Sequence, residues 1–260
     1  MNGISLSVSA NDAIDWPRLR AAGFTFALLR ASVGGTSYAG FDAHWPAMRE
    51  VGLRRCAAHV FRPDQDPIVQ AVRFLKIQLS RGDLPPVLDI DEVESKSLPT
   101  LVAAIHEWLA VVEGELDARH GARILPMIRT SDKVWRRLGQ PSGFDEYPLW
   151  IVDHVRLHDP HCPSPWNAHQ WTFHQYMTQT PDIPGVRSGD LARFNVLGLA
   201  DRGLRVGHLK RALRDAGYEP SDGDELDERT RRHLLHYQAS RQQIQTGLVD
   251  VETFAALHWP

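Results

Sequence analysis

The sequence predicts an α/β protein in which an irregular TIM-like (β/α) barrel over residues 1–200 is followed by a small all-α three-helix domain over residues 201–260. Two observations carry this prediction. Strand-like and helix-like segments alternate through the first half of the chain, and short, charged, helical segments take over near Asp201. Alternating β and α segments are typical of a parallel sheet with helices packed outside it, and closure of that sheet gives a barrel.

The strand and helix segments can be followed in chain order. The pairs are ISLSVS and DAIDWPRLRAAG, FTFALLRASVG and FDAHWPAMREVG, LRRCAAHVFRP and DPIVQAVRFLKIQLSRG, and LPPVLDIDEV and LPTLVAAIHEWLAVVEGELDARHG. The helical segments place apolar residues three and four positions apart, for example Val69, Val72 and Leu75. After ARILPMIRT and SDKVWRRLG, the segments YPLWIVDHV, WTFHQYMT and DLARFNVLG are typical of strands joined by loops. We therefore expect an irregular second half of the barrel.

The tail contains three short helical segments, LRVGHLKRALRDAGY, LDERTRRHLLHYQASR and VETFAALH. Each has an apolar face, formed in the first segment by Val206, Leu209 and Leu213. Three such helices can form a small, marginally stable domain. We expect Asp227 to be the N-cap of the second helix.

Composition argues against several classes of function. The chain has 260 residues, of which 43% are hydrophobic and 23% charged, as in ordinary soluble globular proteins. A net charge of −3 gives no basic footprint for nucleic acid, and no apolar run approaches the ~20 residues that span a bilayer. We expect a monomer that neither binds nucleic acid nor inserts into a membrane.

The cysteines and the N-terminus add two expectations. Cys56 and Cys162 are the two cysteines, so no disulfide framework is implied, and their pairing stays open. The N-terminal stretch MNGISLSVSANDAIDW lacks a positively charged start followed by an apolar segment, so we expect no signal peptide.

The stretch PPVLDIDEV places Asp89 and Asp91 at the end of an apolar run. Because side chains alternate along a strand, both carboxylates should point the same way, and Ile90 and Glu92 the other way. Such a pair could act as acid and base. Aspartate is also common as a turn former and N-cap in strand-to-helix connections, and the pattern taken alone favours that role.

Residues 1 to about 198 resemble the family 25 glycoside hydrolases, lysozymes that cut the sugar backbone of bacterial peptidoglycan. The matching stretches are, in order, AIDWPRLRAAGFTFALLRASVG, AAHVFRP, GDLPPVLDID, YPLWIV, WTFHQYMT and GDLARFNVLG. In the tail, LKRALRDAGY, DGDELDERTRRHLLHYQ and GLVDVETFAAL are similar to the three-helix peptidoglycan-binding module often joined to cell-wall hydrolases. Both resemblances imply bacterial peptidoglycan as the partner and no cofactor.

The resemblance implies a site built from strand ends. Asp89 matches the first member of the family's Asp-x-Glu, and Asp190 matches its final Asp. Asp91 stands where a Glu protonates the leaving glycosidic oxygen, so Asp89, Asp91 and Asp190 are the candidate catalytic residues. The candidate substrate-binding residues are Ser5, His59, Arg129, Trp150, Gln175 and Tyr176.

Four positions depart from the family pattern. Ser5 replaces an Asp, Asp91 replaces the acid Glu, and Ala58 and Arg129 replace residues that are typically Tyr. Asp91 is one methylene shorter than Glu, and ~1 Å of misplacement can cost on the order of a hundredfold in rate.

Two functions therefore stay open. One is a muramidase of weakened activity that cleaves the bond between N-acetylmuramic acid and N-acetylglucosamine. The other is a non-catalytic peptidoglycan-binding protein with a degenerate site. In either case, we expect a protein made in the cytoplasm that reaches the wall by phage-type or secretion-system release, as endolysins and secreted effectors do.

Other candidate side chains have weaker signals. His154, His158, His161 and Cys162 could each bind a metal, but their spacing fits no standard zinc pattern, and we expect no metal site. Trp166 and Trp171 are equally consistent with sugar stacking and with packing.

Overall fold

The computed structural model describes residues 2–7, 12–77, 79–80, 83–93, 97–121, 123–166 and 170–258. Nine strands in these ranges form one sheet with the order β1-β9-β8-β7-β6-β5-β4-β2-β3. Because β1 also pairs with β2, the sheet closes into a barrel, and the short β3 lies outside the ring of the other eight strands. The closed α/β barrel expected from the sequence is confirmed.

The strands are β1 (Asn2–Leu6), β2 (Phe24–Val33), β3 (Thr36–Ser37), β4 (Arg54–Val60), β5 (Val87–Asp89), β6 (Met127–Thr130), β7 (Leu149–Val152), β8 (Trp171–Pro181) and β9 (Ser188–Phe194). Neighbouring strands of the ring from β1 round to β8 pair in parallel, whereas β9 is antiparallel to both β8 and β1, and β3 is antiparallel to β2. In the described ranges no helix joins β7 to β8 or β8 to β9. The second half of the barrel is thus irregular, as predicted.

Helices fill the connections of the first half. They are α1 (Trp16–Ala21), α2 (Phe41–Glu50), α3 (Pro67–Phe74), α4 (Leu98–His120) and α5 (Asp132–Arg137). The longest, α4, is capped at its N-terminus by Ser97, whose side chain accepts a hydrogen bond from the Thr100 N–H, and at its C-terminus by Gly121, with φ of 66°. A left-handed C-cap of this kind favours glycine. The buried face of α4, which includes Trp108, packs into the core outside the sheet.

Aromatic side chains fill the interior of the barrel. Trp150 stacks on Phe173 with ring centroids 4.5 Å apart, and Phe26 meets both rings edge-on at 5.9 and 5.0 Å. The barrel is therefore a packed core with no pore through these three rings.

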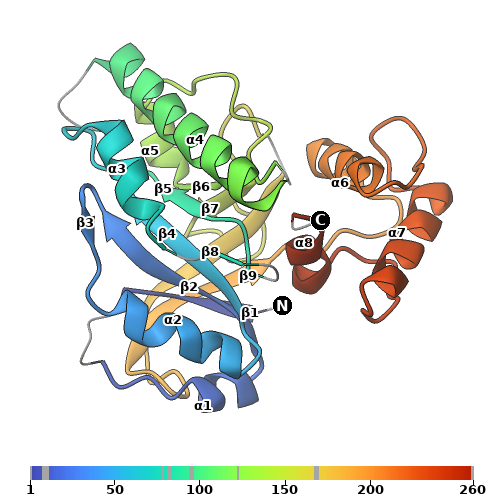
Figure 1. Ribbon diagram of the computed structural model, residues 1–260, viewed down its shortest axis with the longest axis horizontal. Coiled ribbons are helices and arrows are strands. Elements are labelled where there is room, and N and C mark those ends of the chain that lie inside the picture. The colour runs from blue at the N-terminus through green and yellow to red at the C-terminus, as the bar shows by residue number, and fades with distance from the viewer. Residues whose placement is uncertain are drawn as a thin grey trace.

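The tail forms α6 (Leu204–Asp215), α7 (Glu228–Ser240) and α8 (Val251–Leu257), which lie beside the barrel in Figure 1. Asp227 caps α7 as predicted, because its carboxylate accepts a hydrogen bond from the Thr230 N–H at 2.8 Å. None of the helices in the described ranges is long and apolar enough to cross a membrane.

The tail packs directly against one end of the barrel. Phe254 of α8 contacts Phe173 near the start of β8 and Phe194 at the end of β9, with centroid distances of 5.9 and 5.4 Å. Glu252 of α8 forms an ion pair with Arg54, the first residue of β4. The three helices thus cover the end where the parallel strands begin, opposite the end where Asp89 closes β5. One apolar cluster runs through both parts.

Candidate active site

A charged cluster lies where the parallel strands end. Asp89 is the last residue of β5 and pairs in register with Arg129 of β6. Arg129 donates from Nη1 to Asp89 Oδ1 at 2.5 Å, and Arg30 Nη2 lies 3.6 Å from Asp89 Oδ2. Asp89 is 1% exposed and Arg129 is 6% exposed. The Asp89 carboxylate is therefore buried between two guanidinium groups.

Hydrogen bonds continue from this pair to Asp190 in β9. Arg129 Nη2 donates to Gln175 Oε1 at 2.7 Å, and Gln175 Nε2 donates to Asp190 Oδ2 at 3.0 Å. The other oxygen of Asp190 accepts hydrogen bonds from the Thr178 hydroxyl and the Gln179 N–H, both at 2.9 Å. Four predicted site residues are thus joined across the mouth of the barrel: Asp89, Arg129, Gln175 and Asp190.

Ser5 lies beside this chain of hydrogen bonds. It pairs with Asp190 across β1 and β9 and is buried. A serine at this position carries no charge, so the site has one carboxylate fewer than the family pattern implies.

Asp91 lies two residues beyond Asp89 and is more open, with 38% of its side chain exposed. Its Oδ1 is 3.2 Å from Arg62 Nη1. Burial, followed by the charge of Asp89, raises the pKa of Asp91, while Arg62 and Arg30 act in the opposite direction. A carboxyl that keeps its proton above the usual range has the property required of a general acid.

Glu92 corrects the expectation drawn from strand alternation. Its Oε1 lies 3.4 Å from the same Arg62 Nη1 that contacts Asp91, so the two carboxylates converge on one guanidinium. The physical reason is that β5 ends at Asp89. Beyond that residue the pleat no longer forces neighbouring side chains to opposite faces.

His59 was predicted to bind substrate, and the structure contradicts this. Its ring stacks on Trp108 with centroids 5.3 Å apart, and its two nitrogens lie 2.8 Å from Ser32 Oγ and 3.1 Å from Gln70 Oε1. Burial lowers its pKa to about 4. Alternation along β4 turns Ala58 into the barrel and His59 outward to the helices, so His59 is a packing residue.

Trp150 and Tyr176 also lie away from the cluster. Trp150 is 0% exposed inside the barrel, so the expectation that it contacts sugar is wrong. Tyr176 lies near His174 and under the Arg193 guanidinium, at 6.0 and 5.6 Å. Gln175 and Ala192 face the interior of the barrel. Because side chains alternate along a strand, their sequence neighbours His174 and Arg193 project outward. Tyr176 is therefore on the outer face of the barrel, which corrects its predicted role.

The tryptophans left open by the sequence are packing residues. Trp166 is buried and donates from Nε1 to the Tyr147 carbonyl oxygen at 2.8 Å. Trp171 is buried against Arg193, whose guanidinium lies 5.4 Å from its ring.

The other candidates from the sequence do not assemble into a site. Within the described ranges, no group of three or more His, Cys, Asp or Glu side chains could hold a metal ion. His161 instead lies 3.1 Å from a carboxylate oxygen of Asp132. Cys56 and Cys162 are buried free thiols.

Sequence reasoning missed Arg30 and Arg62. Each stands at the carboxyl end of a strand segment or just after it, in ALLRAS and VFRP, at the edge of the sheet where Asp89 lies. Their position could have indicated that both lie near Asp89, because the carboxyl ends of parallel strands meet at one edge of the sheet.

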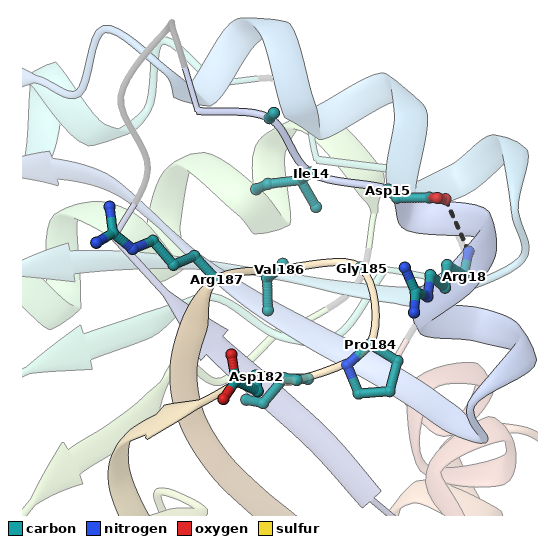
Figure 2. Close-up of a pocket in the computed structure, with 10 residues that line it drawn as sticks. Ile14, Asp15, Arg18, Asp182, Pro184, Gly185, Val186 and Arg187 are labelled. Carbon is teal, nitrogen blue, oxygen red and sulfur yellow. Dashed lines mark hydrogen bonds between the residues drawn. The ribbon is translucent and has the colours of Figure 1, made fainter.

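A hollow of about 580 Å³ is distinct from the candidate site (Figure 2). It is formed by residues 13–15 and Arg18 of α1 and by the turn between β8 and β9, and its charged side chains are Asp15, Arg18, Asp182 and Arg187. None of the residues joined from Asp89 to Asp190 lines it. The candidate site is therefore defined by the hydrogen-bonded cluster and not by this hollow.

Solved structures with a similar fold include lysozymes. The bacterial lysozyme from Streptomyces coelicolor has a TM-score of 0.64 and 26% identity, covering 75% of this chain and 92% of that chain. A family GH25 lysozyme from Aspergillus fumigatus has a TM-score of 0.63, 24% identity, and coverage of 75% and 93%. At that identity, the second likeness shows the fold alone.

Sequence relatives extend the comparison. The uncharacterized protein YegX of Escherichia coli CFT073 is 32% identical over 179 residues, which are 65% of this chain and 62% of the relative. This chain thus spans less than two thirds of that relative's length. YegX of E. coli O157:H7 is 31% identical over 204 residues, 75% of this chain and 70% of the relative. Residues 7–186 match the model of the glycosyl hydrolases family 25, so the chain belongs to that family.

Proposed function

We propose that this protein is a peptidoglycan hydrolase, a muramidase that cleaves the bond between N-acetylmuramic acid and N-acetylglucosamine. The observation that carries the proposal is the pair at the mouth of the barrel. A partly exposed Asp91 with a raised pKa lies beside a buried Asp89 that is fixed by Arg129. A proton donor next to a fixed carboxylate is the arrangement that glycoside hydrolysis requires.

Asp91 is the proposed acid. Its carboxyl gives its proton to the glycosidic oxygen as the bond to the anomeric carbon breaks, which leaves Asp91 ionised. Arg62, 3.2 Å away, then stabilises the new carboxylate. In the second half of the reaction, Asp91 takes a proton from the attacking water and is restored.

The proposed nucleophile belongs to the substrate. The sugar's acetamido oxygen attacks the anomeric carbon, one of the recognised exceptions to the two-carboxylate scheme. Asp89 orients that group. Its Oδ1 is held by Arg129, whereas its Oδ2 accepts no hydrogen bond within the described residues and is assigned to the acetamido N–H.

The same geometry supports weakened activity. The attack places positive charge on the acetamido group, and negative charge nearby stabilises it. Ser5 supplies none, and Arg129 and Arg30 offset the charge of Asp89. These features also favour the second candidate function, a peptidoglycan-binding protein without catalysis.

The tail is proposed as a peptidoglycan-binding domain. Binding there would raise the concentration of the barrel at its substrate. Phage-type or secretion-system release is the proposed route to the wall.

Muropeptide analysis after incubation with purified peptidoglycan tests the function. The natural chain should release new reducing ends, and Asp91→Asn should abolish them. Glu92→Gln is the matched control, because Glu92 contacts the same Arg62 and should leave release largely intact. Sedimentation with the wall without any release of reducing ends would overturn catalysis and support the binding protein.

A further inference from the structure

A buried arginine at the junction between barrel and tail forms no ion pair with a carboxylate of the described residues. Arg205, at the start of α6, is 7% exposed. Its Nη2 donates to the Asn195 carbonyl oxygen, and its guanidinium lies 5.9 Å from the Phe194 ring. Its Nη1 has no hydrogen-bond partner, and no ion pair joins it to a carboxylate of the described residues. A buried cation left in this way is costly, and arginine is rarely buried without a partner.

Arg205 lines a cavity of about 60 Å³ between the barrel and the helices. Thr172, His208, Phe254 and His258 also line it. At ~15 Å³ per probe-sized water, this volume has room for about four waters, or for one small anion. His258 donates from Nδ1 to the Phe254 carbonyl oxygen at 2.8 Å, which leaves Nε2 for another partner.

A larger groove of about 510 Å³ adjoins the cavity, and the two share the lining residues Pro148, His208, Ala212, Leu257 and His258. This volume falls within the usual range for small-molecule sites.

The wall of the groove carries more positive than negative groups. Arg123, Arg211 and Arg241 line it, against the carboxylates Glu146 and Asp215. Arg123 is already paired with Glu146, at 3.0 Å, whereas Arg211 and Arg241 form no ion pair with a described carboxylate.

Two further ionisable groups, Tyr237 and His208, line the groove beside these arginines. Tyr237 is buried in the groove wall, and the Arg241 guanidinium lies 5.3 Å from its ring. Burial, followed by the charge of Arg211, lowers the pKa of His208 to about 4. Burial also lowers the pKa of Arg205 to about 9. The charge of Asp201 acts in the opposite direction on Arg205, as that of Asp145 does on His208, but in both groups burial has the larger effect on the pKa.

We propose that this cavity and groove form a binding site for a carboxylate-bearing ligand, with Arg205 holding the carboxylate and Arg211 and Arg241 contacting the rest. The choice of an acidic peptide as ligand rests on the proposed function, because peptidoglycan carries peptides with free carboxylates. The site lies at the end of the barrel opposite Asp89. Its ligand would therefore belong to a different part of the wall from the sugar in the cleft, and would tether the enzyme.

The test measures binding on the full chain without turnover. The probes are sodium acetate and the tripeptide Ala-Glu-Lys, each compared with sodium chloride at equal ionic strength. Acetate should raise the melting temperature saturably, and calorimetry should detect the tripeptide. Tighter binding of the tripeptide than of acetate assigns the groove to a peptide, and equal binding assigns the cavity to a free small carboxylate.

Variants identify the residues that act. Arg205→Met should weaken binding of both probes by about tenfold or more, which is the effect of losing a charged hydrogen bond. The matched control is Arg202→Met, which removes an exposed arginine paired with Glu225. If Arg205→Met does not fold, Arg211→Met on the open wall of the groove should weaken binding of the tripeptide several-fold and leave binding of acetate unchanged.

Absence of saturable binding by the natural chain would overturn the site, as would unchanged binding in both variants. Release of reducing ends by the same preparations reports on the proposed function separately.

Discussion

Replacing Arg129 by methionine tests whether the ion pair with Asp89 holds the site together. The Nη1–Oδ1 distance is 2.5 Å, and the two side chains are only 7% and 2% exposed. Removing one partner of such a buried pair costs about 3–5 kcal/mol, because the other charge stays buried without compensation. Arg30 remains 3.6 Å from Asp89 Oδ2, so the loss should fall near the lower end, about 3 kcal/mol.

Urea unfolding followed by tryptophan fluorescence gives this free energy. Arg136→Met is the control, because the Arg136–Asp132 pair has the same chemistry at 2.8 Å but is 52% and 31% exposed. An exposed pair of this kind contributes about 0.3–0.5 kcal/mol. Adding Asp89→Asn to Arg129→Met should recover much of the loss, since the uncompensated charge is then gone. If Arg129→Met costs no more than Arg136→Met, the pair does not fix Asp89, and the argument for a preassembled site fails.

Further predictions concern activity, the junction with the tail and pH. The double variant Ser5→Asp with Asp91→Glu should release reducing ends faster than the natural chain; a slower variant that is still folded would mean that the natural site is adapted and not weakened. Phe254→Ala should lower the free energy of unfolding by about 3–4 kcal/mol and shift a single transition, because the ring packs on Phe173 and Phe194; two separate transitions, with the barrel unchanged, would show an independent tail. His208 has a pKa lowered to about 4 from 6.5, so its contribution to stability is complete above pH 6.5 and is lost as the pH falls towards 4. His208→Gln should therefore flatten the loss of stability between these values, and an unchanged pH profile from urea unfolding would contradict this.

Local signals in the sequence predict the elements of this fold well. The alternation of strands and helices predicts the first half of the barrel, because the apolar spacing of each segment depends only on its own backbone. Asp227 is recognisable as an N-cap for the same reason, since the cap acts on the Thr230 N–H three residues away.

The faces of those elements are harder to predict. Ala58 and His59 are adjacent in β4, yet the first faces the barrel interior and the second contacts Trp108 on the outside. A shift of one residue reverses the face of a strand, and matching a family stretch does not reveal it. The predicted orientation of Glu92 was wrong for a different reason: strand alternation was assumed to continue beyond Asp89, where β5 ends.

Contacts between distant segments are the least predictable. Arg30, Arg62 and Asp89 come from three strand ends that meet only when the barrel closes. The helical pattern places Phe254 on the apolar face of its helix. It does not predict that this ring packs against Phe173 and Phe194. Such surfaces are fixed by tertiary packing and not by local spacing.

The departures from the family pattern do not weigh equally. Asp91 in place of Glu keeps the charge and loses reach, and a misplacement of ~1 Å costs about a hundredfold, or about 2.7 kcal/mol. Ser5 in place of Asp removes a charge, and two unit charges 4 Å apart interact by about 4 kcal/mol at an effective dielectric constant near 20. The electrostatic energy lost with the charge at position 5 is thus at least as large as the energy lost through the shorter side chain at position 91. Restoring Ser5 to Asp is also tolerable, because Arg129 and Arg30 already supply positive charge beside the site. Ser5→Asp alone should therefore raise the rate of reducing-end release more than Asp91→Glu alone. The reverse order, measured on folded variants at equal concentration, would show that the position of the acid limits hydrolysis and that the charge at the mouth of the barrel does not.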